Sequence, residues 1–126
     1  MSFTNIAQVN TEHAAWLKGL EFYKAEIHKL ETRLQEVAAK NSAFESRQGI
    51  EHFQNQFVVQ RNNIDELHHK IGEHVSVFTK LPEKLEEVVE NERLADHENL
   101  RDEYFSFEKI LKDLGVEFNM FLAKWM

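Results

Sequence analysis

The chain has 126 residues and a mass of 14.9 kDa, which is the size of one domain. Its 42% hydrophobic content, with ten Phe and two Trp, excludes an intrinsically disordered protein, and one Pro with four Gly is too few for the turns of an all-β fold. The net charge of −7 argues against binding to nucleic acid, and the lack of Cys excludes disulfides, thiol catalysis and zinc ribbons.

The N-terminal residues 1–5 contain no basic or apolar stretch of the kind found in a secretory signal. No apolar run in the chain approaches the length needed to cross a bilayer. We therefore expect a cytoplasmic protein that does not contact membranes.

The first segment, from about residue 5 to 40, is predicted to be one long helix. Its apolar residues recur at alternating steps of three and four, which places them on one face of a helix with a seven-residue repeat. The series contains one polar residue, His13, and reads Ile6, Val9, His13, Trp16, Leu20, Tyr23, Ile27, Leu30, Leu34, Val37.

The second segment, from about residue 43 to 80, repeats this pattern with two polar interruptions, Gln60 and His74. The series reads Ile50, Phe53, Phe57, Gln60, Ile64, Leu67, Ile71, His74, Phe78, Leu81. Ser42 and Glu45 have the spacing of a helix capping box, which predicts that a new helix starts there. The chain is therefore expected to reverse near residue 43, making the first two helices antiparallel.

A third helix is predicted from about residue 82 to 125, because the single Pro, Pro82, suits the first turn of a helix. Its series reads Leu85, Val88, Glu92, Asp96, Leu100, Tyr104, Phe107, Leu111, Leu114, Phe118, Phe121, Trp125. The polar pair Glu92 and Asp96 leaves open a break near 96–97 that would create a fourth helix. The predicted fold is all-α: one domain over residues 1–126, built as an antiparallel up-down-up bundle of three long helices with coiled-coil-like heptad packing.

All four glycines lie inside the predicted helices, where each costs about 1 kcal/mol relative to Ala. They either allow a close approach between helices or are tolerated on the surface. These positions are Gly19, Gly49, Gly72 and Gly115.

The polar interruptions of the three series predict a shared layer. If the chain reverses near residues 43 and 81, His13 and His74 lie at the same level of the bundle and Glu92 lies one turn away. Two neutral imidazoles and a carboxylate can hold a metal such as zinc with one position open. The alternative is a buried polar layer that fixes the register of the helices.

Two other spacings are partial matches to metal sites. Glu66 and His69 form one Glu-x-x-His motif, whereas di-iron bundles need two. The His-x4-Asp spacing of His97 and Asp102 resembles part of the hemerythrin pattern, but His52 is followed four residues later by Gln56, where that pattern needs another ligand. No family is assigned on these motifs.

The C-terminal end is predicted to be a self-association surface. With the assumed reversals, Phe118 lies beside Phe44 and residues 119–126 extend past the first turn with nothing in the chain to cover them. Exposed apolar patches of this kind mark association surfaces. The candidates are Phe118, Phe121, Leu122 and Trp125, which favour a homo-oligomer, with a dimer as the first choice. The alternative is that the helix end folds back onto its own bundle.

Residues 83–103 carry nine acids and three bases, so this stretch either docks a basic protein partner or is a solvated helix face. The sequence contains no Gly-rich phosphate loop, nucleophile elbow or His-Glu-x-x-His motif. We therefore expect a non-enzymatic structural or protein-interaction module that self-associates and has no cofactor. The alternative is a metal-binding bundle, of hemerythrin or di-iron type, that uses the layer of His and Glu.

Overall fold

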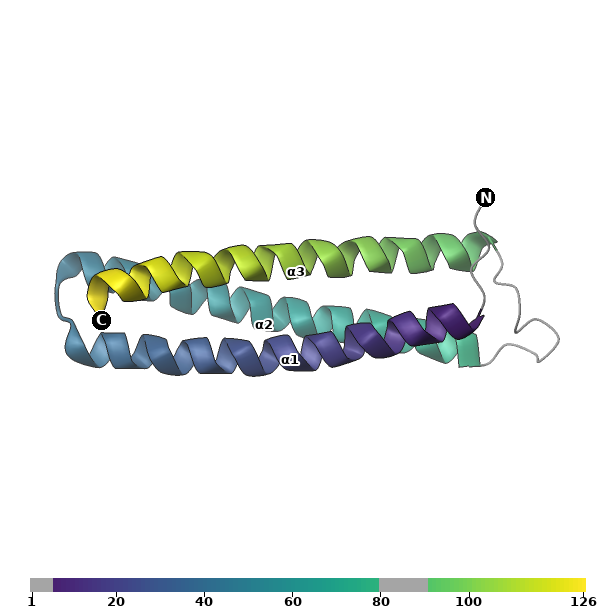
Figure 1. Cartoon of the computed structure of the whole chain (residues 1–126), viewed down its shortest axis with the longest axis horizontal. Helices are drawn as coiled ribbons and strands as arrows, with labels where there is room; N and C mark the ends of the chain where they lie inside the picture. The colour runs from purple at the N-terminus through teal and green to yellow at the C-terminus, as the bar shows by residue number, and fades with distance from the viewer. Residues whose placement is uncertain (1–5, 80–90) are drawn as a thin grey trace.

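The computed structural model describes residues 6–79 and 91–126, which form three helices: α1 (Ile6–Lys40), α2 (Phe44–Thr79) and α3 (Asn91–Trp125). The helices lie side by side along their length, and α2 runs antiparallel to both α1 and α3 (Figure 1). The predicted all-α, up-down-up bundle is confirmed. The bounds of the first two helices agree with the prediction to within a residue or two, whereas the predicted start of the third helix at Pro82 lies outside the described residues.

Helix α3 is continuous from Asn91 to Trp125, so the alternative break near 96–97 is wrong. The predicted path of its buried face was also wrong at one point. Asp96 is exposed and His97 is fully buried, because the alternation of three and four continues back from Leu100 to His97. The buried residues of α3 are His97, Leu100, Tyr104, Phe107, Leu111, Leu114 and Phe118.

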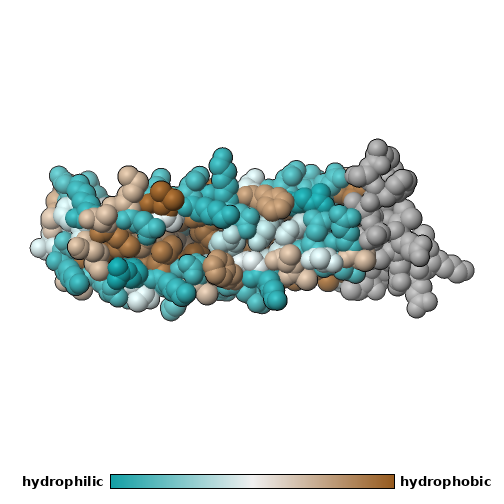
Figure 2. Space-filling model, in the orientation of Figure 1, coloured by the Kyte–Doolittle hydropathy of each residue, from teal (hydrophilic) through white to brown (hydrophobic). Residues whose placement is uncertain are grey.

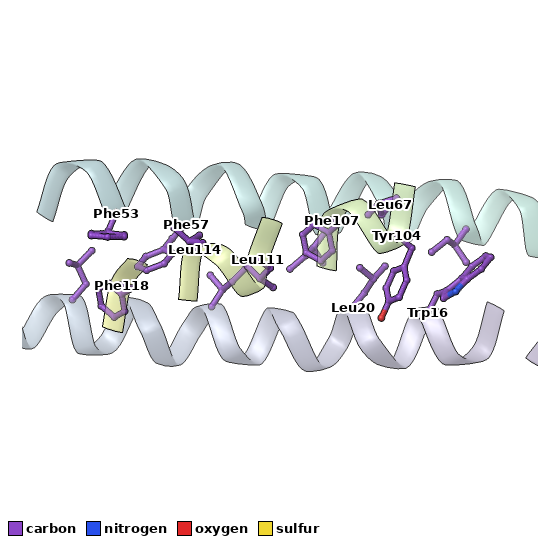
Figure 3. Packing of buried hydrophobic residues seen from close by; sticks show 14 of the residues in the cluster. Trp16, Leu20, Phe53, Phe57, Leu67, Tyr104, Phe107, Leu111, Leu114 and Phe118 are labelled. Atoms are coloured by element: carbon purple, nitrogen blue, oxygen red, sulfur yellow. The ribbon is translucent and has the colours of Figure 1, made fainter. Parts of the chain in front are cut away.

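The hydrophobic core runs the length of the bundle, and Figure 3 shows its aromatic and aliphatic side chains meeting between the helices. Near the α1–α2 turn, the Phe118 ring lies 5.1 Å from Phe53 and 5.2 Å from Phe57, measured between ring centroids. Phe44, the predicted neighbour of Phe118, is instead 74% exposed. The prediction assumed a reversal directly at residue 81, which lies outside the described residues, and it therefore misplaced α3 relative to α2 by about two and a half turns.

The C-terminal end of α3 is docked against the α1–α2 turn. The Asn41 side-chain amide donates to the carbonyl oxygens of Val37 (3.0 Å) and Trp125 (2.9 Å), and Lys124 forms an ion pair with Glu45 at 3.9 Å. The expectation that residues 119–126 extend past this turn was therefore wrong, and the alternative that the helix end folds back was wrong as well, because α3 runs to Trp125 as one continuous helix and ends beside the turn.

Two of the four glycines allow close contacts between helices. A Cβ atom on Gly19 would overlap the hydroxyl group of Tyr104, and one on Gly49 would overlap the ring of Phe121. A Cβ atom on Gly72 or Gly115 would meet no other atom within 4 Å. Gly19 and Gly49 thus allow α3 to lie close to α1 and α2, whereas Gly72 is exposed and Gly115 is half-buried at the groove between α1 and α3.

None of the helices in the described part of the chain has a stretch long and apolar enough to span a bilayer.

Candidate metal centre

Three histidines, one from each helix, meet inside the bundle. His13 of α1, His74 of α2 and His97 of α3 are 3%, 9% and 0% exposed. The His13 ring centroid lies 5.1 Å from that of His74 and 5.1 Å from that of His97, and the last two rings lie 5.6 Å apart. One ring nitrogen from each residue lies within 4.8 Å of the other two. We call these three residues the His triad.

The sequence predicted two members of the His triad. His13 and His74 lie in the same layer, as the reversal near residue 43 implies. Glu92, the predicted third member, belongs to α3, but its side chain lies outside the described part of the structure. Among the described residues, His97 is the third member of the layer, and sequence reasoning missed it because the predicted face of α3 passed through Asp96. Counting back from Leu100 in the three-four alternation would have found it.

An outer pair of charged residues holds the His97 ring. Glu12 of α1 lies with Oε1 3.3 Å from Nε2 of His97. Arg101 of α3 donates from Nε and Nη2 to the two oxygens of the same carboxylate, each at 2.7 Å. When Nε2–H of His97 donates to Glu12, the lone pair of the ring is on Nδ1, a buried atom. Metal-binding histidines in proteins are oriented by a carboxylate in this way.

The aromatic ring of Trp16 forms one wall of the layer. It stacks on His97 with ring centroids 4.8 Å apart and an interplanar angle of 28°, and it meets His13 edge-on at 5.8 Å. Trp16 is 3% exposed, so this wall is part of the core. The stacking restricts the rotation of the two imidazoles and keeps water away from this side of the His triad.

Burial favours the neutral form of all three imidazoles. Burial lowers the pKa of His13 to about 4, and the neighbouring His97 and His74 add to that shift. Burial also lowers the pKa of His74 and of His97, in the latter case against the opposing effect of the Glu12 carboxylate. The hydrogen bond from Arg101 lowers the pKa of Glu12, which keeps this carboxylate charged. A neutral imidazole is the form that binds a metal ion.

The spacing of the His triad fits a metal ion after a small adjustment. Tetrahedral zinc with bonds of about 2.05 Å to nitrogen needs its ligand atoms about 3.3 Å apart. The nitrogens here lie within 4.8 Å of one another, so each pair would have to close by no more than about 1.5 Å around an ion. Imidazole ligands suit zinc, copper, iron or nickel and not magnesium or calcium.

The other predicted metal motifs do not come together. His69 has a 74% exposed side chain and pairs with Glu73 at 3.0 Å on the outer surface of α2. His97 is buried in the layer, whereas Asp102 is exposed on α3 and lines a groove between α2 and α3. The His97–Asp102 spacing therefore does not form a shared site.

The predicted self-association residues pack against their own bundle. Phe118 is fully buried and is not accessible to a second copy. Phe121, Leu122 and Trp125 are half-buried and contact the core. In the acidic stretch 83–103, described from Asn91 onward, Arg101 pairs with Glu12, and Glu103 with Lys70 at 3.3 Å.

No protein-family model matches the chain, and comparisons with curated proteins and with solved structures find no match.

Proposed function

We propose that this protein is a metal-binding helical bundle that holds one divalent transition-metal ion at His13, His74 and His97. The observation that carries the proposal is the convergence of one buried imidazole nitrogen from each of the three helices within 4.8 Å. The carboxylate of Glu12 behind His97 supports it, because the same outer partner orients histidines in known zinc sites.

The competing interpretation is a buried polar layer that only fixes the register of the helices. A single polar residue on a helical seam is enough for that purpose. Here three imidazoles share one layer, and each carries the cost of removing a polar ring from water. Metal coordination explains why all three helices contribute the same side chain.

The test uses the full chain purified without an affinity tag, stripped with a chelator and titrated with Co²⁺ and then Zn²⁺. We expect one ion per chain, visible absorption bands from Co²⁺ and their loss when Zn²⁺ displaces it. Removing one triad ligand in His13→Gln or His97→Gln should abolish tight binding. Circular dichroism verifies that both variants keep their helix content.

The exposed histidines provide the matched control, since surface imidazoles also bind metal ions weakly. His68 and His69 are both exposed on α2, outside the His triad. The double variant His68→Ala, His69→Ala should bind cobalt as the unchanged chain does. The proposal fails if the folded chain binds no stoichiometric ion, or if this double variant loses binding while the triad variants keep it.

A second candidate function, self-association, is favoured by an apolar groove between α1 and α3. The groove has a volume of about 380 Å³ and is lined by Tyr23, Ile27 and Leu30 of α1 and Leu111 of α3, among others. Figure 2 shows hydrophobic surface between these helices toward the α1–α2 turn. Phe22, which lines the groove, is 59% exposed.

We propose that a second copy of this chain covers the groove, because charges on its two rims are complementary. Glu26 on α1 and Lys112 on α3 both line it. The hydrogen bond from Tyr23 to Glu108 shows that residues near 26 and 112 share a level. A two-fold axis parallel to the bundle would set α1 of one copy against α3 of the other and pair Glu26 with the opposing lysine twice.

Light scattering after size exclusion tests this interface by charge reversal. We expect the chain to be a dimer, and Glu26→Lys or Lys112→Glu alone to produce monomers. The double variant should restore the dimer because it exchanges the two charges. The proposed interface is contradicted if the unchanged chain is a monomer. It is also contradicted if the double variant dimerises no more than either single variant does.

A further inference from the structure

A surface groove between α2 and α3 reaches the His triad. It has a volume of about 340 Å³, and His74 and Leu100 are among the residues that line it. Two other grooves, one between α1 and α2 and one between α1 and α3, include no member of the His triad among their lining residues. The groove along His74 therefore connects solvent with the edge of the layer.

The opposite side of the layer is closed. His97 has no exposed side-chain surface, and the Glu12–Arg101 pair lies between it and solvent on the α1–α3 side. Trp16 stacks on the same ring and adds a second barrier. Within the described residues, the two sides of the layer thus differ: one is sealed by an ion pair and an indole, and the other opens at His74.

Acidic residues dominate the rim of the groove. Glu73, Asp96 and Glu103 line it together with one base, Lys70, which is paired with Glu103. Asp96 and His74 line the same groove, so the negative charge of this carboxylate lies near the edge of the layer. A negative rim repels anions and admits neutral molecules and cations.

Three protein ligands leave one position of a four-coordinate ion open. This step rests on the proposed metal site. We propose that the fourth position faces the α2–α3 groove and binds a small neutral donor molecule from solvent, with anions disfavoured by Asp96 and its acidic neighbours. The site is then an open metal centre and not a closed structural one.

Imidazole and azide are the probes, added separately to the cobalt-loaded full chain. Imidazole should shift the visible bands and saturate at one molecule per ion, with cobalt still bound to the protein after gel filtration. Asn99 is exposed and lines the groove, so Asn99→Trp should weaken imidazole binding by at least about tenfold. Asn62→Trp, on an exposed position of α2 outside the groove, is the matched control and should leave imidazole binding unchanged.

The charge of the rim is tested with azide. Asp96→Lys should strengthen azide binding by about tenfold, whereas Asp113→Lys, a reversal farther along α3, should not change it. Cobalt binding without any imidazole response, or an imidazole response kept by Asn99→Trp, overturns the open position while the metal site itself stands. If cobalt does not bind, the proposed function fails and this inference fails with it.

Discussion

The glycines of α1 and α3 allow a quantitative test of the helix contacts. Replacing Gly by Ala inside an exposed helix stabilises it by about 1 kcal/mol, because Ala loses less backbone entropy on folding. At Gly115 the added methyl group meets no atom within 4 Å, so Gly115→Ala should raise the free energy of unfolding by this amount. Gly72→Ala should behave in the same way.

Gly19→Ala should have the opposite sign. Its methyl group would overlap the hydroxyl of Tyr104, a residue that is 5% exposed and therefore has little room to move. Overpacking of this kind costs about 1–3 kcal/mol. Over most of this range the cost is larger than the gain of about 1 kcal/mol that Ala brings to a helix relative to Gly. Displacing Tyr104 also disturbs its 3.4 Å hydrogen bond to Glu108. We expect the free energy of unfolding of Gly19→Ala to be about 2 kcal/mol lower than that of Gly115→Ala.

Urea unfolding followed by circular dichroism measures both variants, with a chelator present so that no metal ion contributes to stability. Tyr104→Phe removes the oxygen atom that the methyl group meets, so Gly19→Ala should be less harmful in that background than alone. This double-mutant cycle separates the steric clash from any general effect on α1. If Gly19→Ala stabilises the chain as much as Gly115→Ala does, the close approach of α1 and α3 at this level is wrong.

The remaining predictions concern the layer and the core. Without metal, lowering the pH from 7 to 5 should reduce the free energy of unfolding by about 2 kcal/mol through His13 alone. The pKa of His13 is 6.5 in the unfolded chain and about 4 in the folded one, so only the unfolded chain gains the proton over this range. Urea unfolding should show this loss of stability, and a chain that is equally stable at both pH values refutes the prediction. Glu12→Gln should weaken cobalt binding by about 10–100-fold with unchanged helix content, and an affinity equal to that of the exposed control Glu117→Gln would show that Glu12 does not position His97. Phe57→Ala removes a fully buried ring and should lower the free energy of unfolding by about 3–5 kcal/mol, measured by thermal or urea unfolding. Phe44→Ala removes an exposed ring and should change that free energy by less than about 0.5 kcal/mol. Similar losses of stability for both variants would contradict the assigned core.

The helices themselves could be predicted from the sequence because each carries an apolar series at helical spacing. The series of α1 and α2 matches the buried residues closely, including the polar members His13, Gln60 and His74. The short turn after Lys40 leaves little freedom in how these two helices pair. Their relative register, and with it the contact between His13 and His74, therefore followed from the position of one turn.

The placement of α3 could not be predicted by the same argument. A helix with a seven-residue apolar repeat packs almost equally well when it is shifted by one heptad along its neighbours, because one layer of Leu and Phe side chains can replace another. The choice of Pro82 as the start of the helix was the single constraint, and it placed Phe118 beside Phe44. The observed partners of Phe118 are Phe53 and Phe57.

The polar residues contain the information that the apolar repeat lacks. A buried imidazole is costly beside Leu or Phe and less costly beside another polar group, so the buried histidines of the three helices are expected to lie in one layer. The observed register puts His97 level with His13 and His74. A shift of α3 by one heptad that sets Tyr104 in that place would separate His97 from the other two histidines. An ion held by one ligand from each helix would strengthen this selection, since it binds in that register and in no shifted one. The His triad therefore favours one register for the docking of the third helix.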